Sequence, residues 1–145
     1  KVFPDAKFVF LVRDPLETIP SYFSLQENVK FGNLLSVDEM KLLRKETYSE
    51  IIEWYKETEK AKSKLYKKQF ITLTYPQITG DLENSISYFY TFIGKKMTKK
   101  FQKQVSDFAE KKYTKKHQSK TIEDYGFTKK QILSDFDFVY QEYFV

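Results

Sequence analysis

A short, unbroken apolar segment, Phe-Val-Phe-Leu-Val at residues 8–12, is the feature that most constrains the fold of this chain. A run of this length, rich in β-branched and aromatic residues, predicts a strand buried on both faces of a parallel sheet. The run ends directly at Arg13, which is followed by Asp14 and Pro15. Asp14 can N-cap a helix that begins at Pro15, because the first helical position needs no N–H donor. The sequence therefore predicts a strand that turns at once into a helix.

The rest of the chain alternates helical patterns with a second strand. Ser36 and Glu39 form a capping box before an amphipathic helix that the pattern extends to about Lys68. Residues 70–75 are predicted to form a strand that Pro76 stops. Three more helices are predicted to start at Asp81, Thr98 and Thr128, and the last carries on one side Ile132, Phe136, Val139, Tyr140 and Tyr143.

This order of elements predicts an α/β fold with short parallel strands and several amphipathic helices. Two strands are too few for a complete doubly wound sheet. The length of 145 residues suits one domain. Because the chain opens on Lys1 rather than Met and reaches a strand almost at once, we expect residues 1–145 to be a single domain or the C-terminal part of a larger one.

Composition excludes several kinds of site. The chain has no cysteine and a single histidine, His117, which excludes disulfides, thiolate chemistry and a multi-histidine metal centre within these residues. No apolar run approaches the roughly 18 residues that cross a bilayer. We therefore expect no transmembrane segment in this chain, while its compartment stays open.

Positive charge is concentrated between residues 95 and 120, which contain ten lysines and only two acidic residues, Asp107 and Glu110. Such a block can attract an anion, or it can be an ordinary solvated surface. Nucleic-acid binding is a third interpretation, but no signature of a known nucleic-acid-binding module is present. We do not expect nucleic acid to be the partner.

Arg13 and Ser21 are the candidate binding residues. Ligands of open α/β sheets collect at the carboxyl ends of the strands, which is where Arg13 is expected, beside a helix start that offers unpaired N–H groups. A guanidinium binds phosphate through its planar fork, and a serine hydroxyl can donate one more hydrogen bond. The alternative is that Arg13 pairs with a carboxylate and Ser21 only occupies a helix surface. Their spacing alone leaves both open.

The segment FPDAKFVFLVRDP at residues 3–15, followed by Ser21 and Tyr22, resembles the 3′-phosphate-binding segment of the sulfotransferase family. Members of that family transfer a sulfuryl group from 3′-phosphoadenosine 5′-phosphosulfate (PAPS) to a hydroxyl or amine. An arginine after a buried strand and a serine eight residues later hold the donor's 3′-phosphate, so the resemblance assigns this role to Arg13 and Ser21. It continues through ITLTY at residues 71–75, the Phe-Ile-Gly that ends at Gly94, and TIEDYGF at residues 121–127.

The resemblance also implies parts that these residues lack. The family's Gly-rich loop for the 5′-phosphosulfate is absent, and no residue before Phe8 fits its catalytic base. We therefore expect a partial P-loop-NTPase-like sulfotransferase fold without its N-terminal phosphate loop, unable to catalyse transfer alone. Lys115 and Lys116 are further candidate phosphate contacts in an expected exposed loop, residues 111–120, that also holds His117.

Two departures affect the donor site itself. Tyr75-Pro76-Gln77 replaces the family's usual Tyr-Glu-Asp, which removes two carboxylates. Pro20 directly precedes Ser21 and is expected to kink or shorten the helix, which could misdirect the serine hydroxyl.

Two functions are therefore open. The first is a sulfotransferase domain fragment that binds PAPS, or the product adenosine 3′,5′-bisphosphate, without a metal, and acts on an acceptor of unknown identity. The second is a catalytically inactive sulfotransferase-like subunit or scaffold that partners other protein subunits in a larger assembly.

Overall fold

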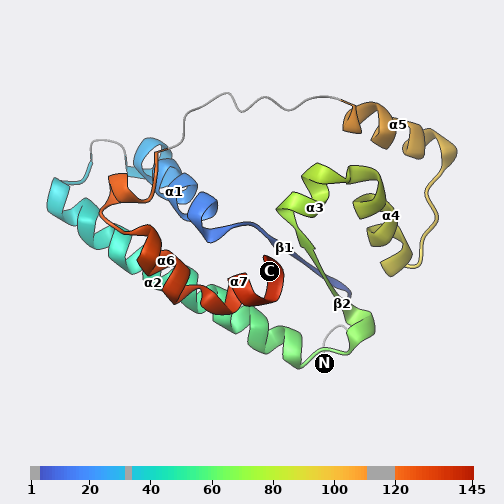
Figure 1. Cartoon of the computed structure of the whole chain (residues 1–145), viewed down its shortest axis with the longest axis horizontal. Helices are drawn as coiled ribbons and strands as arrows, with labels where there is room; N and C mark the ends of the chain where they lie inside the picture. The colour runs from blue at the N-terminus through green and yellow to red at the C-terminus, as the bar shows by residue number, and fades with distance from the viewer. Residues whose placement is uncertain (1–3, 32–33, 111–119) are drawn as a thin grey trace. The chain divides into compact units, whose positions relative to one another are not determined.

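The computed structural model describes residues 4–31, 34–110 and 120–145 (Figure 1). In this part of the chain the structure is mostly helical, with one two-stranded parallel sheet. The chain divides into two units. One unit is built from Lys1–Arg13 and Lys62–Lys116, and the other from Asp14–Ala61 and His117–Val145. The described helices include none that is both long and apolar enough to cross a membrane.

The sheet belongs to the first unit. Strands β1 (Phe8–Val12) and β2 (Phe70–Thr74) pair in parallel, in register from Phe8 opposite Phe70 to Val12 opposite Thr74. The predicted strand is confirmed, but its predicted burial on both faces is wrong. Phe10 and Val12 are buried, whereas Val9 is 36% and Leu11 is 64% exposed. Within the described residues the sheet has only two strands, and the side chains of Val9 and Leu11 on β1 are left exposed.

Three helices follow β2 in the same unit: α3 (Tyr75–Gly80), α4 (Leu82–Phe92) and α5 (Lys99–Ala109). The caps predicted for α4 and α5 are confirmed, since Asp81 accepts from the Asn84 N–H and Thr98 accepts from the Phe101 N–H. Gly94 follows α4 with a φ of +71°, a left-handed conformation that glycine adopts at little cost. The short α3 was not predicted.

The second unit begins with α1 (Pro15–Leu25), which passes directly into π-helical turns over Gln26–Phe31. The helix continues through Pro20, whose ring removes one backbone donor. Helix α2 (Val37–Ser63) starts at the predicted capping box, where the Ser36 N–H donates to Glu39 at 2.8 Å. It ends at Ser63 rather than at Lys68, and a 3₁₀ turn, Lys67–Gln69, leads into β2.

The C-terminal segment completes the second unit with a 3₁₀ turn (Glu123–Tyr125), α6 (Lys129–Asp135) and α7 (Asp137–Tyr143), which lie along α2 (Figure 1). The prediction of one helix here is wrong, because the backbone leaves the helix at Phe136, with φ of −108° and ψ of 18°. Ile132, Phe136 and Val139 are fully buried. The Phe136 ring packs on Tyr55 and Tyr48, with centroids 5.4 and 6.1 Å away.

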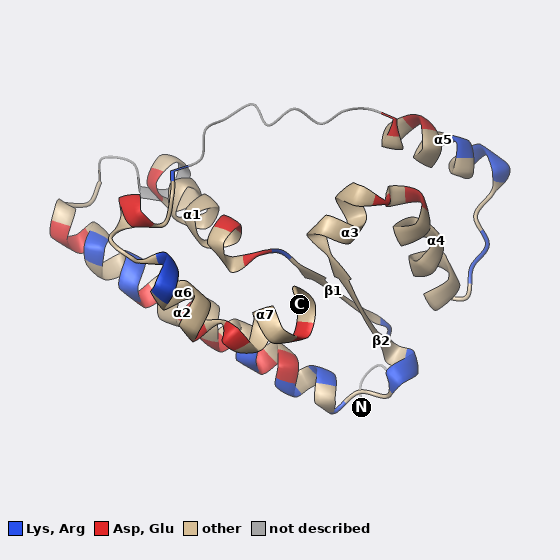
Figure 2. Ribbon diagram, viewed as in Figure 1, with Lys and Arg blue, Asp and Glu red and all other residues tan. Residues whose placement is uncertain are grey.

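Charged residues are distributed differently in the two units (Figure 2). Basic residues occupy the segment between α4 and α5 and the first half of α5, while α2 carries both signs along its length.

Candidate functional site

Arg13 and Tyr75 are the first residues after β1 and β2, and both lie at the carboxyl edge of the sheet. The parallel register pairs Val12 with Thr74, and the next residue of each strand lies just beyond its carboxyl end. There the guanidinium carbon of Arg13 is 4.5 Å from the centroid of the Tyr75 ring. This is a cation–π contact, in which the positive charge of the guanidinium is attracted to the face of the aromatic ring. Tyr75 therefore helps to hold the Arg13 side chain at this edge of the sheet.

The start of α3 fixes the position of Tyr75. Thr74 and Gln77 form a capping box, in which the Thr74 N–H donates to the Gln77 side chain at 2.9 Å and the Gln77 N–H donates to the Thr74 hydroxyl at 3.4 Å. Sequence reasoning assigns Gln77 no role of its own, because it notes only that Gln77 stands where the resembled family usually has a carboxylate. The signal for its role was present, since Thr-x-x-Gln is a capping-box pattern and Pro76 suits the first turn of a helix.

Ser21 lies on α1 with its side chain exposed, while its neighbours Ile19, Pro20 and Phe23 are buried. Pro20 is therefore part of the core of the second unit, and Ser21 is on the surface of that unit. Arg13 and Ser21 belong to different units, so their joint site stays a prediction. Lys115, Lys116 and the rest of residues 111–119, which make up all but the last residue of the loop predicted at residues 111–120, lie outside the described residues.

The first turn of α1 does not offer the unpaired N–H groups that the sequence suggested. The Asp14 carboxylate accepts from the Leu16 N–H at 2.9 Å. The Asp14 carbonyl oxygen accepts from the N–H groups of Glu17 and Thr18, each at 2.9 Å, and Pro15 has no N–H. Because Asp14 already places a negative charge at this helix terminus, a second anion is disfavoured there. Arg13 is the stronger candidate for binding an anion.

Asp14 is also held by the C-terminal helix. The Tyr140 hydroxyl donates to the Asp14 carboxylate at 2.5 Å. Burial, followed by this hydrogen bond, raises the pKa of Tyr140 above its ordinary value. Burial and the nearby Asp14 charge also raise the pKa of Tyr55. The sequence predicted Tyr140 only as a core residue, because nothing in it indicates a contact between residues 126 positions apart.

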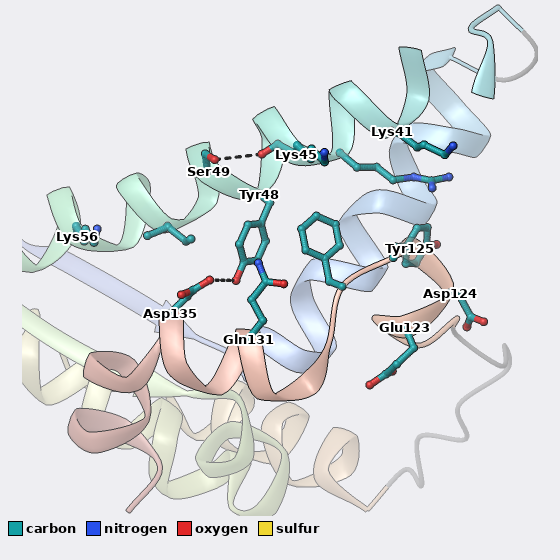
Figure 3. Close-up of a pocket in the computed structure, with 14 residues that line it drawn as sticks. Lys41, Lys45, Tyr48, Ser49, Lys56, Glu123, Asp124, Tyr125, Gln131 and Asp135 are labelled. Carbon is teal, nitrogen blue, oxygen red and sulfur yellow. Dashed lines mark hydrogen bonds between the residues drawn. The ribbon is translucent and has the colours of Figure 1, made fainter. Parts of the chain in front are cut away.

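A groove of about 930 Å³ lies within the second unit, between α2 and the segment from the 3₁₀ turn to α6 (Figure 3). The α2 side presents Lys41, Lys45 and Lys56, and the other side presents Glu123 and Asp135. The Tyr48 hydroxyl donates to Asp135 at 2.7 Å across the base of the groove. Its walls thus carry opposite charges, an arrangement that sequence reasoning did not detect.

An ion cluster shares Arg44 with the lining of this groove. Glu27 accepts from Arg44 and, at 2.9 Å, from Lys120. Burial acts to raise the pKa of Glu27, but the hydrogen bonds from Lys120 and Arg44 outweigh it and hold this pKa below its ordinary value. Arg44 and Lys120 also lie over the Tyr125 ring, 5.2 and 5.3 Å from its centroid. These contacts attach the 3₁₀ turn to α2 and to the π-helical turns that follow α1. No cluster of three histidine or acidic side chains suited to a metal ion occurs among the described residues.

Residues 1–99 of the chain match the family model described as the sulfotransferase family. This range contains β1, Arg13, Ser21, β2 and α4. No curated protein and no solved structure matches the chain. The matched range is more than half of the 145 residues, and this chain therefore belongs to the sulfotransferase family.

Proposed function

We propose that this chain is the donor-binding part of a sulfotransferase that uses PAPS, with Arg13 and Ser21 holding the 3′-phosphate. The acceptor of the sulfuryl group is a hydroxyl or an amine. Membership of the family supports a nucleotide sulfate donor. The observation that carries the proposal is the position of Arg13, at the carboxyl edge of the sheet and stacked on Tyr75.

The chemistry of each residue suits a phosphate group. A guanidinium such as that of Arg13 can donate to two phosphate oxygens through its planar fork, and an exposed hydroxyl such as that of Ser21 can donate to a phosphate oxygen. PAPS supplies the sulfuryl group, while Arg13 and Ser21 bind the donor and orient it. A charge-assisted hydrogen bond of this kind contributes about 1.5–3 kcal/mol, which corresponds to roughly a tenfold to hundredfold change in affinity.

Calorimetric titration of the full chain with adenosine 3′,5′-bisphosphate tests this assignment. We expect Arg13→Ala to raise Kd by about tenfold or more, and Ser21→Ala to raise it by a smaller factor. Arg13→Lys should fall between Arg13→Ala and the unchanged chain, because lysine keeps the charge but loses the planar fork. The matched control is Lys45→Ala, which removes one exposed positive charge from α2.

Titration with adenosine 5′-phosphate isolates the 3′-phosphate. Arg13→Ala should leave the affinity for this nucleotide unchanged, because the group that Arg13 binds is missing. An equal loss for both nucleotides would overturn the 3′-phosphate assignment. Failure of the unchanged chain to bind adenosine 3′,5′-bisphosphate would overturn the donor-binding function.

The second candidate is a catalytically inactive subunit, and the exposed apolar side chains of β1 favour it. Val9 and Leu11 are aliphatic, lie on one face of the sheet and are open to solvent in this chain. Such a face suits contact with another protein surface. An absence of nucleotide binding, together with stable association with another subunit, would favour this function.

A further inference from the structure

Tyr75 lies where it can restrict the side chain of Arg13. Each is the residue that directly follows a strand, Arg13 after β1 and Tyr75 after β2. The parallel register brings both to the same edge of the sheet, and the guanidinium carbon of Arg13 is 4.5 Å from the centroid of the Tyr75 ring. Both residues belong to the first unit, so the contact lies within one unit of the chain.

A long side chain at this position gains from such a contact. Arg13 lies between the end of β1 and the start of α1, outside both elements. An arginine that binds a ligand loses rotational freedom, and this loss lowers the affinity by roughly twofold to tenfold when it occurs on binding. A neighbour that already restricts the arginine in the ligand-free chain removes part of this cost.

Local structure fixes the backbone of Tyr75. Strand β2 passes directly into α3, so Tyr75 is the first residue of that helix (Figure 1). The Thr74–Gln77 capping box satisfies the helix start, and Thr74 is itself buried. Helix α3 contains no charged residue, so it brings no carboxylate to this edge that could compete with a phosphate for Arg13.

The contact depends on the aromatic ring of Tyr75 rather than on its hydroxyl. A guanidinium is attracted to the face of the ring, and phenylalanine offers a similar face. Tyr75 should therefore act on Arg13 even without its hydroxyl. A residue that donates a hydrogen bond to the nucleotide would instead need that group, so the two roles can be separated by experiment.

We propose that Tyr75 is a positioning residue for the donor's 3′-phosphate, acting through Arg13 and not by contact with the nucleotide. Its ring restricts the guanidinium at the sheet edge before the ligand arrives, so binding costs Arg13 less freedom. This role rests on the proposed binding of the 3′-phosphate by Arg13.

Calorimetric titration of the full chain with adenosine 3′,5′-bisphosphate tests the role of the ring. Tyr75→Leu should raise Kd by about threefold to tenfold, because Arg13 is no longer held. Tyr75→Phe should stay within about twofold of the unchanged chain, because it keeps the ring. The matched control is Tyr88→Leu, which removes an exposed tyrosine ring from α4 of the same unit and should also change Kd by less than about twofold.

A double-mutant cycle distinguishes positioning from direct contact. In an Arg13→Ala background, Tyr75→Leu should have no further effect on Kd, because the group that Tyr75 positions is gone. Adenosine 5′-phosphate lacks the 3′-phosphate and should bind equally to the Tyr75→Leu variant and to the unchanged chain. An undiminished loss in the Arg13→Ala background, or an equal loss for both nucleotides, would overturn the inference.

Nuclear magnetic resonance of the ligand-free chain tests the same contact without a nucleotide. The chain has two arginines, Arg13 and Arg44, so Arg13→Lys identifies the Nε–H signal of Arg13. The order parameter of this group should fall in Tyr75→Leu and be retained in Tyr75→Phe. An unchanged order parameter in Tyr75→Leu would contradict the positioning role. Failure of the unchanged chain to bind adenosine 3′,5′-bisphosphate would instead overturn the donor-binding function on which that role rests.

Discussion

At the scale of single residues, Asp14 links the start of α1 to the end of the chain. Its carboxylate caps the helix through the Leu16 N–H and accepts from the Tyr140 hydroxyl of α7. Tyr143 makes a comparable hydrogen bond to Glu59 of α2. Tyrosines of the last helix thus attach it to both α1 and α2, and Ser21 lies on the first of these. Loss of one such bond should therefore weaken the second unit as a whole.

Tyr140→Phe keeps the ring and removes only the hydroxyl. We expect the free energy of unfolding to fall by about 1–2 kcal/mol at pH 7, because Asp14 loses a hydrogen bond in a half-buried position. Urea denaturation followed by circular dichroism measures this loss. Tyr88→Phe is the matched control, since Tyr88 is exposed and the same atom is removed. An equal loss in both variants would contradict the role of the Asp14 contact.

The raised pKa of Tyr140 also predicts how stability depends on pH. Burial and the Asp14 hydrogen bond favour the neutral phenol in the folded state, whereas the unfolded chain ionises near its ordinary pKa of about 10. The contribution is therefore fully present below about pH 10 and is lost as the pH rises further. Stability of the unchanged chain should fall above this pH, and Tyr140→Phe should fall less steeply. Parallel curves would contradict the assignment.

At the scale of elements, the break between α6 and α7 shows a limit of periodicity. Residues 132, 136 and 139 keep helical spacing, and all three are fully buried although the helix stops at Phe136. A pattern of apolar residues reports which side faces the core, and it does not report a local change of φ and ψ. The core contact of Phe136 is therefore predictable, while the break is not.

Phe136→Ala tests whether this junction supports the second unit. Phe136 packs on Tyr48 and Tyr55, and its removal should cost about 3–5 kcal/mol of unfolding free energy. Leu133→Ala in the adjoining helix α6 is the control, because Leu133 is 39% exposed and its removal should cost less than about 1 kcal/mol. Should Phe136→Ala fail to fold, Phe136→Leu supplies a milder change of about 1.5 kcal/mol. Equal costs for Phe136→Ala and Leu133→Ala would show that the junction is not part of the core.

At the scale of the whole molecule, sequence reasoning succeeded where a local signal decided the structure. The side chains of Asp14, Ser36, Asp81, Thr98 and Thr128 cap helices as predicted, because each acts on N–H groups two or three residues away. Arg13 likewise follows β1 at the sheet edge. Contacts made through tertiary folding could not be predicted, among them the stacking of Arg13 on Tyr75 and the hydrogen bond from Tyr140 to Asp14. The error about β1 has the same origin, because burial on both faces needs elements that a strand pattern does not specify.

The face of the sheet that carries Leu11 and Leu73 supplies a test of how the sheet is covered. Leu11 and Leu73 are opposite each other in the parallel register and lie on one face, yet Leu11 is 64% and Leu73 is 8% exposed. Leu73→Ala should lower the free energy of opening of β2 by about 2–5 kcal/mol, whereas Leu11→Ala should change it by less than about 1 kcal/mol. Amide hydrogen exchange at residues 70–74 measures both, and it reports on the first unit alone. A large cost for Leu11→Ala would mean that another protein surface, from a second copy or a partner, covers this face in solution.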